Sequence, residues 1–220
     1  MSALSTCFGC SRAAAPHPWQ ATGSPKVFDN GRMAIASFMV PLGSPIPPFR
    51  LASVEGATVS DEDFPDAPAL LVVFLSNHCP YVRRIERGIG ALTAEYAAKG
   101  VATVGIGSND VVRYPDDDAG HLREQAARAG FAFPYLVDET QDTARAYRAA
   151  CTPDFFLYDG DRRLAYRGEF DGARPKNDLP VDGSSLRAAL DLVLAGKAVP
   201  EPHTPSLGCG IKWKPGDEPV

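Results

Sequence analysis

Unbroken apolar runs alternate with helically spaced apolar positions through the middle of the chain. Residues 69–75 are all apolar and are followed by polar residues, a pattern typical of a strand buried on both faces. Apolar side chains then recur at spacings of three and four residues, which predicts an amphipathic helix that ends near Gly100. A second apolar run at 101–106 predicts another buried strand. These segments together predict a β-α-β unit.

The alternation of strands and helices continues toward residue 150 and then changes. A helix predicted at 116–129 begins with acidic residues, and a strand at 135–137 and a helix at 142–150 follow it. Two strands are then predicted on either side of a short turn at 159–161, which favours an antiparallel hairpin. Ser184 is predicted to cap a last helix. The pattern predicts an α/β fold in which helices cover both faces of a central mixed sheet.

Proline and small residues are concentrated at the two ends of the sequence. We expect residues 1–44 to form a loosely ordered N-terminal arm, although the apolar residues at 33–36 can dock on the domain. Residues 45–197 are expected to form the folded domain. Residues 198–220 are expected to form a proline-rich C-terminal tail that contains Cys209.

Composition and charge limit the classes of protein to which the chain can belong. Its 220 residues suit one domain with extensions, and its net charge of −5 argues against a nucleic-acid-binding surface. No apolar run is long enough to cross a membrane, and the first residues lack the basic and apolar segments of a secretory signal. Five cysteines are too few for a disulfide-stabilised scaffold. We therefore expect a cytoplasmic protein with mostly reduced thiols, and the sequence leaves its oligomeric state open.

Cys79 stands where the first predicted strand ends and the first predicted helix begins. Peptide dipoles and free N–H groups at a helix N-terminus favour negative charge, which lowers the pKa of a thiol below its usual value of ~8.5. The thiolate is the nucleophilic form, and Pro80 fits the first helical position, where no N–H is needed. Cys79 is therefore the predicted nucleophile, and the alternative is a small buried core residue.

Polar neighbours of Cys79 favour a reactive role. Ser76 is a candidate to hydrogen-bond the reacting sulfur or a peroxide oxygen, and a solvated turn is its alternative. His78 is a candidate to stabilise the thiolate or to relay a proton. Its alternative is to point away from Cys79, because adjacent side chains in an extended chain face opposite ways. Arg83 and Arg84 would raise the local positive potential.

Three motifs give the chain a resemblance to a known family. They are residues 74–82 around Cys79, the segment 152–159 that begins with Thr-Pro, and residues 205–213 near the C-terminus. The chain resembles thioredoxin-fold redoxins of the alkyl hydroperoxide reductase/thiol-specific antioxidant type, and among them a subgroup with an Asn-His-Cys-Pro motif. The resemblance covers roughly residues 45–196 and implies a thioredoxin-like fold.

The resemblance also implies the surroundings and the activity of the site. In that fold a Thr-Pro pair with a cis peptide lies beside the nucleophilic cysteine, so Thr152, Pro153 and Pro80 are the expected substrate contacts. The implied activity is reduction of a disulfide or a hydroperoxide. A thiol–disulfide protein or a low-molecular-weight thiol is the expected electron donor, and no cofactor or metal is expected.

Two departures from the family patterns leave the type of reaction open. Val82 replaces the second cysteine of a Cys-x-x-Cys site, so Cys79 lacks the usual resolving thiol. Peroxiredoxins have Thr or Ser three residues before their reactive cysteine, as Ser76 is here, and proline seven residues before it, where this chain has Val72. Neither the disulfide reductase pattern nor the peroxidase pattern is complete.

Other cysteines supply candidate partners for Cys79. Cys151 is the leading resolving candidate, because the resemblance places its loop opposite Cys79, and a buried structural thiol is the alternative. Cys209 is a candidate to reach Cys79 or to pair with another subunit, and an incidental exposed thiol is the alternative. Cys7 and Cys10 have redox and zinc spacing but lie in the arm, so we expect no function for them.

Three functional hypotheses follow from these residues. The first is a thiol-dependent oxidoreductase that uses Cys79 with Cys151 or Cys209. The second is a non-catalytic thioredoxin-like module that binds partners or senses oxidation, which the replacement by Val82 favours. The third and weakest is metal handling through Cys7, Cys10 and Cys209.

Overall fold

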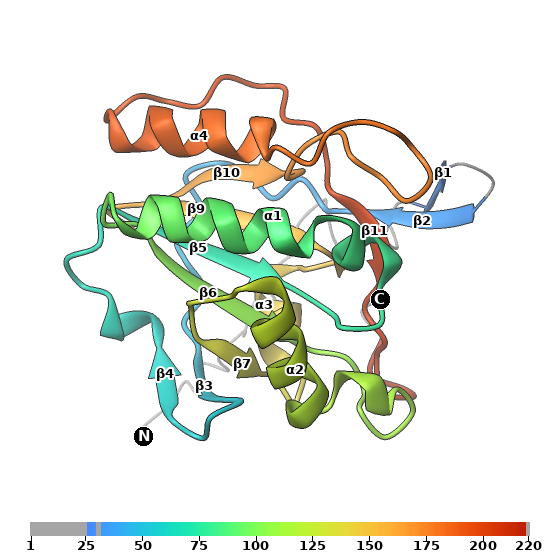
Figure 1. The fold of residues 1–220 in the computed structure, drawn as a ribbon. Coiled ribbons are helices and arrows are strands. Elements are labelled where there is room, and N and C mark those ends of the chain that lie inside the picture. The colour runs from blue at the N-terminus through green and yellow to red at the C-terminus, as the bar shows by residue number, and fades with distance from the viewer. Residues whose placement is uncertain (1–25, 30–31, 219–220) are drawn as a thin grey trace, which may run out of the picture.

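The computed structural model describes residues 26–29 and 32–218 (Figure 1). The helices are α1 (Pro80–Ala97), α2 (Ala119–Ala129), α3 (Asp142–Tyr147) and α4 (Ser184–Leu194). The strands are β1 (Lys26–Asp29), β2 (Arg32–Ala36), β3 (Arg50–Ser53), β4 (Thr58–Ser60), β5 (Ala69–Phe74), β6 (Ala102–Gly107), β7 (Tyr135–Val137), β8 (Cys151–Thr152), β9 (Asp154–Asp159), β10 (Leu164–Gly168) and β11 (Leu207–Gly210). No helix in this part of the chain has both the length and the apolar character needed to span a membrane.

A seven-stranded mixed sheet forms the centre of the fold, in the order β10-β9-β5-β6-β7-β3-β4. β5, β6 and β7 are parallel because α1 and α2 return the chain across the sheet between them. The hairpin β9–β10 pairs antiparallel with β5, and the hairpin β3–β4 pairs antiparallel with β7. Every residue of the central strand β5 is buried, as its continuous apolar sequence predicts.

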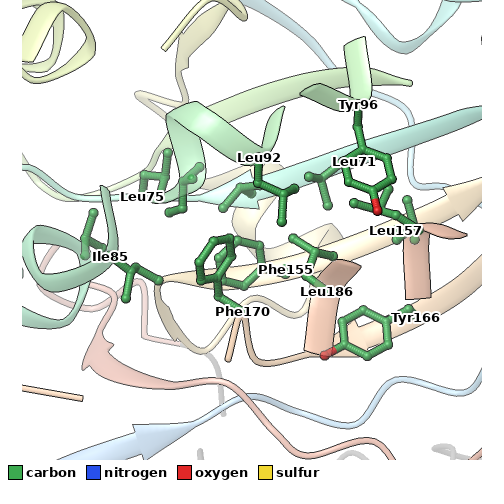
Figure 2. Packing of buried hydrophobic residues seen from close by; sticks show 14 of the residues in the cluster. Leu71, Leu75, Ile85, Leu92, Tyr96, Phe155, Leu157, Tyr166, Phe170 and Leu186 are labelled. Atoms are coloured by element: carbon green, nitrogen blue, oxygen red, sulfur yellow. The ribbon is translucent and has the colours of Figure 1, made fainter. Parts of the chain in front are cut away.

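Helices cover both faces of this sheet, as the hydrophobic pattern predicted. Alternate residues of β5 face opposite sides. Leu71 and Val73 pack under α1, α2 and α4, and Figure 2 shows Leu71 among the residues of this layer. Val72 and Phe74 pack against α3 and the segment 38–51 on the other side. Burying one such side chain stabilises the fold by about 1.5–3 kcal/mol. Two packed layers therefore hold β5 rigidly at the position from which α1 begins.

Three predicted helix boundaries are wrong by a few residues. α2 begins at Ala119 rather than 116, because Asp118 caps it by accepting a hydrogen bond from the His121 N–H (2.9 Å), and residues 115–117 form a separate 3-10 turn. α3 ends at Tyr147, three residues early. Ser184 is the first helical residue of α4 rather than its cap, which is Gly183, and the Gly183 N–H donates to a buried Asp171 carboxylate (2.8 Å).

Residues 26–29, 32–36 and 207–210 form strands within the segments for which an arm and a tail were expected. β1, β2, β11 and β8 form a second, four-stranded sheet, in which β11 lies between β2 and β8 (Figure 1). The Tyr81 hydroxyl of α1 also donates to the Asp29 carboxylate at the end of β1 (2.7 Å). Strands from both ends thus pair with each other beside α1, where a loosely ordered arm and a tail were expected.

Gly208 explains how β11 approaches β8 so closely. A Cβ atom at this position would lie 2.0 Å from the Thr152 carbonyl oxygen, a distance that no side chain tolerates. The register that results pairs Cys209 with Thr152. The C-terminal segment therefore brings its cysteine to the start of α1.

Candidate active site

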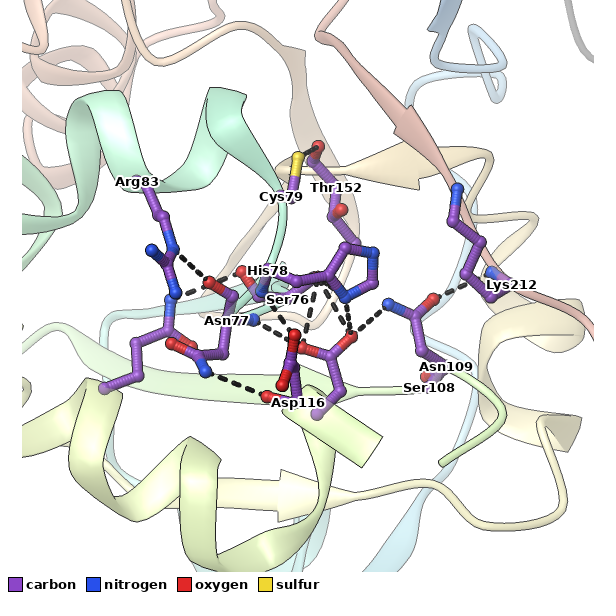
Figure 3. Close-up of polar contacts among 12 residues, drawn as sticks. Ser76, Asn77, His78, Cys79, Arg83, Ser108, Asn109, Asp116, Thr152 and Lys212 are labelled. Carbon is purple, nitrogen blue, oxygen red and sulfur yellow. Dashed lines mark hydrogen bonds and ion pairs between the residues drawn. The ribbon is translucent and has the colours of Figure 1, made fainter. Parts of the chain in front are cut away.

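Cys79 is the N-cap residue of α1, at the end of the rigid strand β5. Its backbone is extended (φ −70°, ψ 121°), Pro80 occupies the first helical position, and the Arg83 N–H donates to the Cys79 carbonyl (2.9 Å). The prediction that Cys79 lies at a helix N-terminus is confirmed. Its side chain is fully buried, and as a thiol it donates to the Thr152 carbonyl (3.0 Å), as Figure 3 shows.

Cys209 is the partner thiol that the structure brings to Cys79. Burial raises the pKa of Cys79, but a hydrogen bond from the Cys209 thiol and one from the Val82 N–H outweigh it and lower the pKa to about 6. The same hydrogen bond to Cys79, together with burial, raises the pKa of Cys209 above its usual value. The two opposite shifts therefore favour an ionised Cys79 beside a protonated Cys209.

Cys151 lies on the neighbouring strand but in a different environment. Its side chain is fully buried, and its sulfur lies 3.6 Å from the Pro153 carbonyl and 4.0 Å from the Ser206 carbonyl. Burial raises the pKa of the Cys151 thiol well above its usual value. The sequence favoured Cys151 over Cys209 as the resolving thiol, and the structure places both near Thr152, which the Cys79 sulfur contacts.

Asp117 is the central acceptor of a polar network beside Cys79. It lies in the 3-10 turn before α2, and its carboxylate accepts hydrogen bonds from the Asn77 N–H (2.6 Å), the Ser76 hydroxyl (3.0 Å) and the Asn109 amide (2.5 Å). Burial would raise the pKa of Asp117, but hydrogen bonds from His78 and Asn109 hold it below its usual value. Asp117 is therefore a buried anion that fixes the loop between β5 and α1.

His78 is held between this anion and an aromatic ring. Its Nδ1 lies 2.8 Å from Asp117 Oδ2, and its ring stacks on Tyr114 with centroids 5.5 Å apart and planes 14° apart. The hydrogen bond to Asp117 raises the pKa of His78 above 6.5. Lys212, whose backbone N–H donates to Asn109 (2.7 Å), lies on the other side of this network (Figure 3).

Asn77 fixes the rest of the loop from three directions. Its side-chain amide donates to the Asp116 carbonyl (2.8 Å), while its side-chain and main-chain oxygens accept from Arg128 (2.9 Å) and Arg83 (2.6 Å). Arg84 instead donates to the Leu179 carbonyl (2.9 Å). The arginines that follow Cys79 are therefore used in holding backbone in place.

The other predicted site residues also lie near Cys79, and Ser76 contacts a different group from the one expected. Ser76 is buried and donates to Asp117, so its hydroxyl supports the network rather than the sulfur. Thr152 and Pro153 are joined by a cis peptide and lie against Cys79, as the resemblance implied, and Pro80 is partly exposed at the start of α1. Cys7 and Cys10 lie outside the described residues.

Asp117 is the residue that the sequence analysis missed. It was assigned to the acidic start of a helix, a common role for aspartate. The signal was the run Asp116-Asp117-Asp118, because a helix needs one capping carboxylate and Asp118 supplies it. Asp117 is therefore not needed as a cap, and its buried carboxylate contacts His78 instead.

The chemistry of the arrangement follows from these contacts. A thiolate, a neighbouring thiol and a charged histidine–aspartate pair can support nucleophilic attack at sulfur or oxygen and transfer of a proton. Among residues 26–29 and 32–218, no group of three or more potential metal ligands is found. Cys79 is covered, whereas His78, Cys209 and Lys212 are partly exposed, so these three form the side of the site that reaches the surface.

Solved structures share this fold. The chain is similar to an uncharacterized conserved protein from Geobacillus kaustophilus, with 47% identity and a TM-score of 0.81 over 83% of this chain and 97% of that one. A hypothetical protein from Sinorhizobium meliloti 1021 has 45% identity and a TM-score of 0.81 over 82% of this chain and 99% of that one. A putative thiol:disulfide interchange protein DsbE from Chlorobium tepidum has 20% identity and a TM-score of 0.56 over 70% and 98%, which shows the fold alone.

The family is shown by a match over more than half of the chain. No curated protein matches the sequence. The profile of the AhpC/TSA family matches residues 42–167, a range that contains Cys79, Asp117, Cys151 and Pro153 and ends before Cys209. The chain has a thioredoxin-like fold and belongs to the AhpC/TSA family.

Proposed function

We propose that the protein is a thiol-dependent oxidoreductase in which Cys79 and Cys209 alternate between two thiols and a disulfide. Two observations support this pairing: β11 pairs Cys209 with Thr152, and the Cys79 sulfur lies 3.0 Å from the Thr152 carbonyl oxygen. The interaction of the two thiols also lowers the pKa of Cys79 and raises that of Cys209. A nucleophile that is ionised near neutral pH beside a protonated second thiol is the starting state that a two-step exchange needs.

With a disulfide substrate, the Cys79 thiolate attacks one sulfur of the substrate. A mixed disulfide forms, the substrate S–S bond breaks, and the first half leaves as a thiolate. Cys209 then loses its proton and attacks the Cys79 sulfur, which releases the second half of the substrate. The substrate gains two electrons, and the protein is left with a Cys79–Cys209 disulfide.

With a hydroperoxide, the Cys79 thiolate attacks the terminal oxygen. An S–O bond forms, the O–O bond breaks, and Cys79 becomes a sulfenic acid while an alcohol or water leaves. Cys209 attacks that sulfur, the S–O bond breaks, and water leaves with the Cys209 proton. Both substrates therefore end in the same disulfide, which a thiol–disulfide protein or a low-molecular-weight thiol of the cytoplasm reduces.

The non-catalytic module is the second candidate function, and the burial of Cys79 favours it. A side chain with an exposed fraction of 0% requires β11 or the adjoining loop to move before a large substrate reaches the sulfur. In that case Cys79 would react slowly even with small reagents. The rate of its reaction separates the two candidates.

The experiment compares three variants in the full chain. We expect Cys79→Ser to abolish the reaction with both hydrogen peroxide and bis(2-hydroxyethyl) disulfide, because the nucleophile is gone. Cys209→Ser is expected to keep the first step and to trap a sulfenic acid or a mixed disulfide, detected by mass spectrometry. Cys151→Ser is the matched control and is expected to complete the cycle. Full activity of Cys79→Ser would refute the proposal.

A further inference from the structure

The Asp117–His78 pair lies beside Cys79 and takes no part in the thiol exchange described above. The Asp117 side chain is 2% exposed, and its carboxylate accepts several hydrogen bonds, including one from the Asn109 amide. A buried carboxylate is stable only when it is hydrogen-bonded and paired with a positive charge. The 2.8 Å contact with Nδ1 makes the imidazolium of His78 that counter-charge.

The other ring nitrogen of His78 is available to a reactant. No hydrogen bond joins Nε2 to any residue in the described part of the chain, and the His78 side chain is 23% exposed. Stacking on Tyr114 fixes the plane of the ring. In Figure 3 the imidazole lies between Cys79 and Lys212.

The groups that face His78 favour its protonated form. Asp117 has the largest influence, and the Cys79 thiolate adds to it, so both raise the pKa of His78. Burial of the ring and the charge of Lys212 lower the pKa of His78. The pKa of His78 is raised overall and that of Cys79 is lowered, so both shifts favour a thiolate beside an imidazolium.

We propose that Asp117 is a positioning residue that keeps His78 protonated, and that His78 gives its Nε2 proton to the group that leaves when Cys79 attacks. The proposal rests on the proposed role of Cys79 as nucleophile. With hydrogen peroxide, the S–O bond forms and the O–O bond breaks, and the leaving hydroxide takes the Nε2 proton and becomes water. Cys79 is oxidised to sulfenic acid, the peroxide is reduced, and His78 regains a proton from solvent.

Hydrogen peroxide and iodoacetamide are two small neutral reagents that distinguish proton donation by His78 from a role of His78 in forming the Cys79 thiolate. Hydrogen peroxide loses hydroxide, which needs a proton, whereas iodoacetamide loses iodide, which needs none. The rate of Cys79 modification by each reagent is measured against pH in the full chain, with mass spectrometry identifying the modified residue. We expect a bell-shaped profile for peroxide, which rises as Cys79 ionises near pH 6 and falls as His78 loses its proton. The iodoacetamide rate rises in the same way and then stays constant.

Variants of the pair test the assignment. His78→Gln is expected to lower the peroxide rate by about 100-fold at its maximum and to remove the fall at high pH, the usual scale for loss of a general acid. Its iodoacetamide rate on the plateau should change little. Asp117→Asn is expected to move the falling limb of the peroxide profile to lower pH. His121→Gln is the matched control, because His121 forms an exposed pair with Asp118 (2.9 Å), and neither profile should change.

Two results would overturn the proposal while leaving the role of Cys79 intact. One is an equal loss of both rates in His78→Gln, which indicates a structural role or a role in thiolate formation alone. The other is a wild-type peroxide profile that rises and never falls. If wild-type Cys79 reacts with neither reagent, it is instead the proposed function that fails.

Discussion

The sulfurs of Cys79 and Cys151 both contact the Thr152–Pro153 segment, and both side chains have an exposed fraction of 0%. Their pKa values nevertheless move in opposite directions, down to about 6 for Cys79 and well up for Cys151. The sulfur of Cys79 receives hydrogen bonds from the Cys209 thiol and the Val82 N–H. Both sulfurs lie near carbonyl oxygens, but no hydrogen bond lowers the pKa of Cys151 within the described part of the chain, so burial raises it. Burial is common to the two sites, so the donors around each sulfur decide its chemistry.

The largest expected effect is a change in the pKa of Cys79 when the Cys209 thiol, a donor that Cys151 lacks, is removed. Cys209→Ala leaves Cys79 buried without its thiol donor, so its pKa should rise above about 6, while the remaining Val82 N–H limits the rise. The pH dependence of iodoacetamide alkylation at Cys79 measures this shift. Cys209→Ser, which retains a hydroxyl donor, should shift less, and Cys151→Ala should not shift it. Equal midpoints in all four proteins would contradict the comparison.

A second prediction concerns the backbone that brings the donor into place. Gly208→Ala puts a Cβ atom 2.0 Å from the Thr152 carbonyl oxygen, so β11 must move away from β8. We expect a loss of about 1–3 kcal/mol in the free energy of unfolding, together with a raised pKa for Cys79. Chemical denaturation and the alkylation assay measure the two effects.

Gly210→Ala is the matched control on the same strand. Its added Cβ would lie 3.1 Å from the flexible Ile35 side chain and 3.9 Å from the Ala150 carbonyl oxygen, an ordinary van der Waals distance. It should be milder in both assays. A Gly208→Ala protein with wild-type stability and a wild-type Cys79 pKa would show that the β8–β11 pairing does not activate Cys79.

The smallest predicted effect is on the pH dependence of stability. Between about pH 6 and pH 9 the unfolded state holds the Cys79 proton and the folded state does not, so Cys79 makes the free energy of unfolding rise with pH. Asp154, whose pKa burial raises to about 8, acts in the opposite direction over an overlapping range. The difference between wild type and Cys79→Ser isolates the Cys79 contribution, because both proteins contain Asp154.

We therefore expect wild type to gain stability relative to Cys79→Ser from pH 6 to pH 8. Equilibrium denaturation at a series of pH values measures the difference. The same comparison with Cys151→Ser should show no such gain, because the raised pKa of Cys151 keeps it protonated across this range. A flat difference for Cys79→Ser would mean that its thiol is not ionised in the folded protein.

The sequence predicted the central sheet because its signals are local and strong. The continuous run of β5, the spacing of apolar residues in α1 and the short turn between β9 and β10 each favour one structure. The position of Cys79 at the start of α1 followed from the same pattern. The fold and the position of Cys79 between β5 and α1 could therefore be predicted from the sequence alone.

The partner of Cys79 was not predictable in the same way. Cys209 lies far from Cys79 in sequence, and the four-residue strand that contains it has two glycines and no alternating pattern. Its place depends on pairing with β8 and β2, which is a tertiary choice. The role of Asp117 also depends on tertiary structure. Its carboxylate accepts hydrogen bonds from Ser76 and Asn77, which are distant in the sequence, whereas the sequence alone predicts only a helix cap.

Mapping of the disulfide formed by the full chain after mild oxidation tests the central claim most directly. The protein is treated with one equivalent of hydrogen peroxide, blocked, digested without reduction and analysed by mass spectrometry. The account predicts a peptide pair that joins Cys79 to Cys209 and leaves Cys151 as a free thiol. A Cys79–Cys151 linkage, or a Cys79 that remains a free thiol while other cysteines oxidise, would contradict it.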